Sequence, residues 1–151
     1  MRALAQRVRE AWVTSAPERE APADEVGRIG AGLAVLVGVT HEDDEAVARR
    51  LADKLYHLRV LDDGEGGMNL SCADTGGELL VVSQFTLYGD TRKGRRPSFV
   101  AAARPEVAEP LVDLLVAHLR ELGATVATGR FRTHMEVHLV GDGPVTVLVE
   151  V

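Results

Sequence analysis

The start of the chain alternates between apolar and polar side chains with a period of two, which is the pattern of β-strands. Residues 2–14 follow this pattern and predict one strand. Residues 15–24 are rich in Pro, Ala and Glu and predict an exposed hairpin loop. A short return strand is predicted over 26–29 and a second buried strand over 32–39.

Apolar residues recur at helical spacing in two places. Thr40 is the predicted N-cap of the first helix, because a run of acidic residues follows it and suits the positive end of the helix dipole. The apolar stripe of this helix is formed by Val47, Leu51, Leu55 and Leu58. The second helix is predicted from about Pro105 to Leu122, with the proline in the first turn and Gly123 ending it.

The remaining apolar runs predict further strands. The run 79–82 follows two glycines and consists of branched aliphatic residues, the pattern of a strand buried on both faces. The tail predicts strands over 124–128, 135–140 and 145–151, the last two joined by a turn at 141–144. A brief strand is also expected near 59–61. This order predicts one α+β domain over residues 1–151, with a mixed, largely antiparallel sheet and two main helices.

Composition narrows the class of protein. A chain of 151 residues is long enough for one domain with a sizeable core. The formal net charge of −6 argues against broad binding to DNA or other nucleic acids. No apolar run reaches the length of a membrane span, and the N-terminus lacks the apolar segment of a signal peptide, so a cytoplasmic protein is expected. The single cysteine, Cys72, excludes an internal disulfide, and with no base nearby it is read as inert.

Polar side chains follow the buried strand abruptly. Ser83, Gln84 and Thr86 come directly after the aliphatic run, and such groups are costly to bury without partners. Two interpretations remain open from composition: these residues line the mouth of a pocket, or they cap the next loop.

A cluster of four cations follows a few residues later, at Arg92, Lys93, Arg95 and Arg96. A charge run is usually a solvated loop. Its place beside the polar strand end also allows a local contact with phosphate groups.

The motifs of common hydrolases and metalloenzymes are missing from the sequence, and neither a metal nor a cofactor is expected. His134 and His138 would share one strand face about 13 Å apart, too far for one metal ion. Gly143-Pro144 is usually only a turn. Were this X-Pro bond cis, however, two carbonyl groups would point in nearly the same direction and form a rigid pair of acceptors.

Several short motifs together resemble one family, the D-aminoacyl-tRNA deacylases. The resemblance runs nearly end to end and lies in Gln6-Arg7-Val8, Gly30-Ala31-Gly32-Leu33, Ser83-Gln84-Phe85-Thr86-Leu87, Lys93-Gly94-Arg95-Arg96-Pro97-Ser98-Phe99, Thr128-Gly129-Arg130-Phe131 and Gly143-Pro144-Val145-Thr146. It implies a barrel-like core and an enzyme that hydrolyses the ester of D-aminoacyl-tRNA as a homodimer, with active sites at the subunit interface.

The resemblance also implies roles for individual residues. Ser83, Gln84, Phe85 and Thr86 match the motif that floors the pocket for the 3′-terminal adenosine and the scissile ester. Gly143 and Pro144 match a cis pair that enters the partner's pocket, where its carbonyls receive the substrate's α-amino group and an L-residue clashes. Arg7 matches the arginine that braces this pair, and Phe131 and Met135 match residues of the pocket wall.

The expected chemistry is ester hydrolysis in which the substrate's ribose 2′-hydroxyl activates water. Backbone N–H groups around Gln84 and Phe85 are candidates for stabilising the oxyanion, and Thr86 is expected to position groups rather than attack. Glycyl-tRNA, which has no side chain to clash, should be the hardest substrate to exclude.

Two departures and two alternatives accompany the resemblance. Gly141 stands where the family commonly has Asn. The 15–24 loop is longer than expected for the family and is interpreted as a tolerated surface insertion. The same fold resembles the editing module of some archaeal threonyl-tRNA synthetases, which removes an L-amino acid. A non-catalytic module that binds the tRNA 3′ end is the alternative from a different class.

Overall fold

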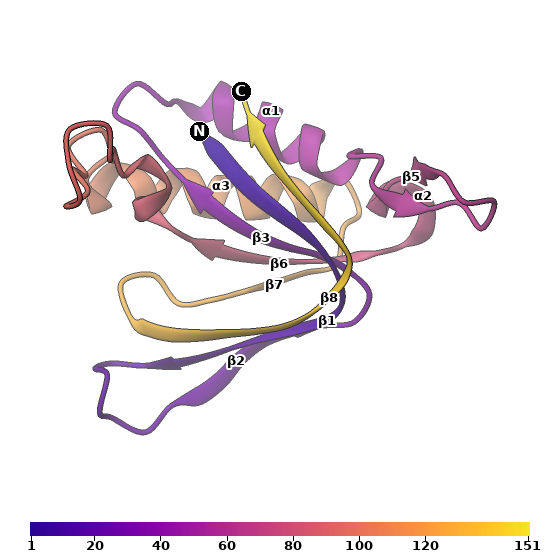
Figure 1. Ribbon diagram of the computed structural model, residues 1–151, viewed down its shortest axis with the longest axis horizontal. Coiled ribbons are helices and arrows are strands. Elements are labelled where there is room, and N and C mark those ends of the chain that lie inside the picture. The colour runs from indigo at the N-terminus through magenta and orange to yellow at the C-terminus, as the bar shows by residue number, and fades with distance from the viewer.

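A computed structural model describes all 151 residues, and its sheet is mixed, as the sequence predicts. Two long helices lie side by side across one face of the sheet (Figure 1). In chain order the elements are β1 (Arg2–Ala16), β2 (Asp24–Ile29), β3 (Gly32–Gly38), α1 (Glu45–Tyr56), β4 (Leu61–Asp62), β5 (Met68–Leu70), α2 (Cys72–Thr75), β6 (Glu78–Ser83), the 3-10 helix η1 (Phe85–Tyr88), α3 (Pro105–Glu121), β7 (Val126–Thr128) and β8 (His134–Glu150).

Strand β1 organises the sheet because it pairs with three other strands. Its first half pairs antiparallel with β3 and its second half antiparallel with β2. Along its other edge β1 pairs antiparallel with β8 over almost its whole length. Strands β6 and β7 then extend the sheet in parallel, giving the order β2-β1-β3-β6-β7. The predicted α+β class with a mixed, largely antiparallel sheet is confirmed.

The sheet curls until its two ends approach each other, so it nearly closes into a barrel (Figure 1). The ends meet where Gly27 of β2 faces Thr128 of β7. A side chain at Gly27 would place its Cβ only 2.7 Å from the Thr128 carbonyl oxygen. The close approach of these two strands therefore requires glycine at this position.

The central strands β3 and β6 are buried on both faces, as predicted for β6. One face packs under α1 and α3, where 24 buried residues form the larger core. The other face lines the inside of the barrel, where seven buried residues form a smaller core. In β6 the alternation is clear, because Leu79 and Val81 belong to the larger core and Leu80 and Val82 to the smaller one.

The first helix begins later than predicted. Its N-cap is Asp44, whose carboxylate accepts a hydrogen bond from the Val47 N–H at 2.9 Å. Thr40 does not cap the helix, and its hydroxyl donates to the Ala101 carbonyl oxygen at 2.6 Å. The second helix agrees with prediction, with Pro105 in the first turn and Gly123 at φ +100° after the end. A third, very short helix, α2, was not predicted.

The tail differs most from prediction, because the two strands expected on either side of a turn form one strand, β8, of 17 residues. Strand β1 pairs with both halves of β8, and the register shifts between Gln6 and Val8 and again between Val8 and Glu10. Gly143 (φ +131°) and Pro144 lie in this irregularity, joined by a cis peptide bond.

The predicted loop at 15–24 is shorter in the structure. Strand β1 continues to Ala16 and β2 begins at Asp24, and Ser15 is buried and pairs with Asp24. None of the helices has the length and apolar character that crossing a bilayer requires.

Candidate functional site

A cavity of about 490 Å³ opens at the carboxyl end of β6. It lies within the size range of small-molecule sites and is lined mainly by apolar side chains with a few polar groups. Its lining residues are Val39, Val82, Ser83, Gln84, Phe85, Ala103, Pro105, Ala108, Phe131, Arg132, Thr133, Met135 and Val137. Five of the residues predicted from the sequence are among them: Ser83, Gln84, Phe85, Phe131 and Met135.

The end of β6 positions the polar part of this cavity. The Gln84 N–H donates to the Val37 carbonyl oxygen of β3 at 2.7 Å, which fixes the backbone where the strand stops. The chain then turns into η1, so that Phe85 and Thr86 lie at the amino end of this short helix. The Gln84 side-chain amide donates to the Thr86 hydroxyl, which orients both groups.

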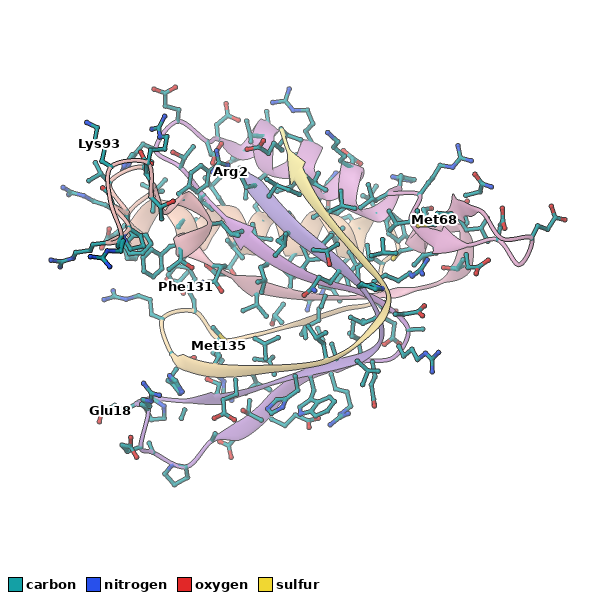
Figure 2. All side chains as sticks on the ribbon, in the orientation of Figure 1. Arg2, Glu18, Met68, Lys93, Phe131 and Met135 are labelled. Atoms are coloured by element: carbon teal, nitrogen blue, oxygen red, sulfur yellow. The ribbon has the colours of Figure 1, made fainter.

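Phe131 and Met135 reach the cavity from the segment between β7 and β8 and from the start of β8. Both lie at the same end of the molecule as Lys93, and Met68 lies at the opposite end (Figure 2). Gly129 makes room for Met135, because a Cβ at Gly129 would lie 2.6 Å from the Met135 sulfur. The absence of a side chain at Gly129 thus allows Met135 to take its position in the cavity wall.

The cavity holds no side chain that acts as a general base near neutral pH. Arg132 is its only ionisable lining residue, and arginine remains protonated in proteins. Arg132 is also the one non-glycine residue of the chain with positive φ, at +57°. Sequence reasoning missed Arg132, since nothing in the sequence separates it from the neighbouring Arg130.

The expected pair of oxyanion donors needs a correction. The Gln84 N–H is already engaged by the Val37 carbonyl oxygen and is not free to bind a ligand. The Phe85 N–H stands at the first position of η1, where a helical N–H has no acceptor within its own helix. Of the two groups, Phe85 is therefore the one able to donate to a bound oxyanion.

Gly143 and Pro144 lie far from this cavity in the same chain. Met135 lines the cavity, and Gly143 follows it eight residues further along β8. At strand rise this places the two about 26 Å apart along the strand. One chain therefore does not bring its Gly143-Pro144 pair and its own cavity together.

Arg7 holds the Gly143-Pro144 segment in place. Its Nε donates to the Asp142 carbonyl oxygen at 3.0 Å, and its Nη1 donates to the Val60 carbonyl oxygen at 3.0 Å. An ion pair with the Asp142 carboxylate at 3.3 Å adds to these bonds. The Arg7 side chain is only 14% exposed. It thus joins β1, the residue before β4 and the irregular part of β8.

The basic loop is more ordered than a solvated charge run. Asp90 and Ser98 close it through two backbone hydrogen bonds of 2.8 and 2.9 Å. Arg92 donates from two nitrogens to the Asp90 carboxylate, and these hydrogen bonds hold the pKa of Asp90 down to about 2. Lys93, Arg95 and Arg96 are exposed and have no acidic partner. The four predicted cations therefore divide into one internal anchor and three free charges.

Two further sequence expectations concern residues outside the cavity. The His138 ring stacks on Trp12 at 4.9 Å between centroids, which gives it a packing contact rather than a ligand. Cys72 is fully buried, and burial raises the pKa of its thiol to about 11. A thiol in this environment is not a nucleophile near neutral pH.

Comparison with known proteins gives a consistent result over the whole chain. A family model described as D-Tyr-tRNA(Tyr) deacylase matches residues 4–150. The D-aminoacyl-tRNA deacylase of Nocardia farcinica is 61% identical over 153 residues, covering 99% of each chain. The D-aminoacyl-tRNA deacylase of Heliobacterium modesticaldum is 57% identical over 150 residues, covering 99% of this chain and 96% of that one.

Solved structures share the fold. A structure named c-Myc DNA Unwinding Element Binding Protein has a TM-score of 0.90 and 34% identity, covering 100% of this chain and 99% of that chain. A structure described as a probable eukaryotic D-amino acid tRNA deacylase has a TM-score of 0.81 at 17% identity, covering 99% of this chain and 98% of that chain. The second likeness concerns the fold alone.

Proposed function

We infer that this chain, which belongs to the D-Tyr-tRNA(Tyr) deacylase family, hydrolyses the ester bond of D-aminoacyl-tRNA and releases the free D-amino acid and tRNA. This inference is supported by the family match over residues 4–150, together with relatives at 53–61% identity that are named D-aminoacyl-tRNA deacylase. Such an activity removes wrongly charged tRNA before translation uses it, which is a proofreading function expected in the cytoplasm.

The cavity at the end of β6 is the proposed site for the aminoacylated 3′ end. Ser83, Gln84, Phe85 and Thr86 form the floor against which the terminal adenosine and the ester lie. Phe131 and Met135 form the wall beside the amino-acid side chain. In support, five of these six residues line one cavity whose volume suits a nucleoside with its amino acid.

The complete site is proposed to need a second copy of the chain. Gly143 and Pro144 lie about 26 Å along β8 from the cavity wall, so they would act in the cavity of a partner. Strand β8 pairs only with β1, which leaves its other edge open for another chain. Its exposed apolar residues favour burial in a homodimer; they are Val137, Leu139, Val140 and Leu148.

Chirality is proposed to be read by the backbone. Two enantiomers carry the same chemical groups, so a protein separates them only through fixed positions for those groups. The Gly143 and Pro144 carbonyls would accept hydrogen bonds from the α-amino group, which leaves room for a D-side chain and none for an L-side chain. Support comes from the three contacts of Arg7, which fix the segment before Gly143. Glycyl-tRNA lacks the side chain that would clash, so it is a proposed second substrate.

The proposed hydrolysis relies on the substrate for its base. The cavity lining contains no carboxylate or histidine, and the Thr86 hydroxyl already accepts a hydrogen bond from Gln84. The ribose 2′-hydroxyl would orient a water molecule, whose oxygen attacks the ester carbon. The 2′-hydroxyl would accept the proton of this water while it passes its own proton to the 3′-oxygen, which leaves as the ester C–O bond breaks. The Phe85 N–H would stabilise the oxyanion, a contribution of roughly 3–4 kcal/mol in known cases.

Contacts with the tRNA backbone are proposed for the basic loop. Lys93, Arg95 and Arg96 would contact phosphate groups, because they are exposed and have no acidic partner. Arg92 would serve mainly to hold the loop, because Asp90 engages it on two nitrogens. Raising the salt concentration should therefore weaken tRNA binding, and charge reversal at Arg95 should flatten this dependence.

The test is single-turnover hydrolysis of D-Tyr-tRNA and L-Tyr-tRNA by the purified protein, with a chelator present. We expect rapid loss of the D-ester while the L-ester persists at its uncatalysed rate. Equal rates on both esters would mean that the Gly143-Pro144 pair does not select chirality. Preferential loss of an L-ester would favour the editing-module alternative, and hydrolysis of neither would favour a module that only binds the tRNA end.

A further inference from the structure

Two phenylalanine rings are exposed together at the rim of the cavity. Phe85, which lines the cavity, is 56% exposed, and Phe99 is 39% exposed. Their rings meet edge to face with centroids 5.2 Å apart. Exposed aromatic side chains that gather beside a cavity are unusual on a monomer surface and mark a place where something binds.

The backbone around this pair holds Phe99 in a fixed position. The loop that precedes Phe99 is closed by the two hydrogen bonds between Asp90 and Ser98. Gly89 permits the contact, because a Cβ there would lie 2.9 Å from the Phe99 ring. The pair is therefore preformed, and a ligand that binds there need not order it first.

The segment after Phe99 is anchored as well. The Thr40 hydroxyl donates to the Ala101 carbonyl oxygen at 2.6 Å, and the His41 ring nitrogen lies 2.7 Å from the Val100 carbonyl oxygen. Both anchors come from the turn between β3 and α1. Phe99 thus stands between two braced pieces of backbone.

The three free cations, Lys93, Arg95 and Arg96, belong to the loop that Asp90 and Ser98 close, directly before Phe99. Figure 2 places Lys93 at the end of the molecule that also carries Phe131 and Met135. Stacking surfaces flanked by positive charge are how proteins bind single-stranded nucleic acid, because the rings hold the bases and the cations follow the phosphates.

We propose that the Phe85–Phe99 pair is the stacking platform for the base of the nucleotide that precedes the terminal adenosine of the tRNA. This inference rests on the proposed function, in which the cavity holds that terminal adenosine. Phe85 lines the cavity, whereas Phe99 contacts Phe85 without lining the cavity, so the preceding base would lie over Phe99 just outside it. The phosphates further along the strand then meet Lys93, Arg95 and Arg96.

A second copy of this chain is the other occupant to consider for an exposed apolar pair. The flanking charges favour the nucleic acid, since a phosphate backbone complements three unpaired cations. The platform also provides contact with the tRNA whatever amino acid is attached. Recognition of the tRNA end and recognition of chirality would then use different surfaces of the protein.

The test is a double-mutant cycle, in which the Phe99 ring is removed from the protein, the base is removed from the RNA, or both are removed together. Binding of an uncharged RNA minihelix ending in CCA is measured by fluorescence anisotropy, and compared with the same RNA carrying an abasic nucleotide before the terminal adenosine. We expect Phe99→Leu to weaken binding of the CCA end about tenfold, the size expected for loss of one stacked base. The abasic RNA should bind the unmodified protein more weakly by a similar factor, and the two changes together should cost no more than one alone.

Two variants control this cycle. Phe99→Tyr should bind the CCA end as tightly as the unmodified protein does, because tyrosine keeps the aromatic face. Met68→Ala removes a side chain that is 52% exposed at the opposite end of the molecule and should leave binding unchanged (Figure 2).

The inference is overturned if Phe99→Leu weakens binding of the abasic RNA as much as that of the intact RNA, or leaves both unchanged. It is also overturned if Phe99→Leu dissociates a dimer in analytical ultracentrifugation, since the ring would then pack against a second copy. Hydrolysis of D-Tyr-tRNA is measured separately. If the unmodified protein fails to hydrolyse it, the proposed function fails, whereas a failed binding cycle with intact hydrolysis overturns only the platform.

Discussion

At the scale of single residues, Arg7 connects parts of the chain that are far apart in sequence. Its guanidinium binds the carbonyl oxygens of Val60 and Asp142 and pairs with the Asp142 carboxylate. Because the side chain is largely buried, these bonds are poorly replaced by water. Arg7 therefore determines where the Gly143-Pro144 segment stands relative to β1.

Replacing Arg7 by Leu should lower both stability and activity. We expect the free energy of unfolding to fall by about 2–4 kcal/mol, because two charged hydrogen bonds are lost and the Asp142 carboxylate loses its partner. Hydrolysis of D-Tyr-tRNA should fall as well, since the segment that is proposed to meet the amino group is no longer held. Urea unfolding and single-turnover hydrolysis measure the two effects.

Arg9→Leu is the matched control for this substitution. Arg9 lies two residues further along the same strand, is exposed and forms no ion pair or side-chain hydrogen bond. It should change stability by no more than about 0.5 kcal/mol. Arg7→Lys should rescue only partly, because one ammonium group cannot span both carbonyl oxygens. Equal effects of Arg7→Leu and Arg9→Leu would contradict the bracing role.

At the scale of elements, closure of the sheet depends on β2 and β7, which lie close together but do not pair through a ladder of backbone hydrogen bonds. Strands β2 and β7 stand at the two ends of the sheet path, and the barrel nearly closes where Gly27 faces Thr128. The atom that a side chain at Gly27 would meet belongs to the backbone, so it cannot rotate out of the way. Closure is therefore sensitive to a single methyl group.

Gly27→Ala should destabilise the protein by about 1–3 kcal/mol through this overpacking. Gly30→Ala is the comparison, since its Cβ would meet only the Glu78 carboxylate, at 3.8 Å. That variant should be within about 0.5 kcal/mol of the parent. Urea unfolding of both variants gives the difference, and a Gly27→Ala variant as stable as Gly30→Ala would refute the closure argument.

The elements also show what the sequence can predict. Strand β6 could be predicted because its aliphatic run needs burial on both faces, and Ser83 could be predicted as its end. Strand β8 could not, because Gly143-Pro144 has the composition of a turn and only the pairing of β1 with both halves makes it one strand. Asp44 and Thr40 are both acceptable caps by residue type, and the choice depends on the contact of Thr40 with Ala101.

The cavity was predictable only where its residues are contiguous. Ser83, Gln84 and Phe85 follow one another, and the polarity of Ser83 and Gln84 directly after an apolar run indicates either a pocket mouth or a capped loop at this point of the chain. The opposite walls come from Ala103 and the first turns of α3 and from the segment that leads into β8 together with the start of that strand. Only the tertiary fold brings these parts near β6; their residues are Ala103, Pro105, Ala108, Arg132, Thr133 and Val137. The engagement of the Gln84 N–H by Val37 likewise depends on the pairing of β3 with β6.

At the scale of the whole molecule, the proposed site divides between the two ends of one chain. The cavity lies at the carboxyl end of β6, whereas the Gly143-Pro144 pair is held by Arg7 near the opposite end. A homodimer with twofold symmetry would bring each pair into the other chain's cavity and form two equal sites. The central claim is that each working site takes its cavity from one chain and its Gly143-Pro144 pair from another.

Subunit mixing tests this claim most directly. One variant, Thr86→Val with Gln84→Leu, keeps Gly143-Pro144 and removes two of the three polar side chains of the proposed floor. The other, Gly143→Val, keeps the cavity and alters the pair, because valine does not tolerate φ +131° and its Cβ would lie 2.9 Å from Val145. Each variant alone should hydrolyse D-Tyr-tRNA poorly, and thermal unfolding confirms that each is folded before mixing.

The two variants are then unfolded together, refolded at equal concentration and assayed for D-Tyr-tRNA hydrolysis. If the site is shared, mixed dimers contain one intact site each, and activity should rise to about a quarter of that of the unmodified protein. Activity that stays at the mean of the two separate variants would contradict the account, because each chain would then be using its own Gly143-Pro144 pair.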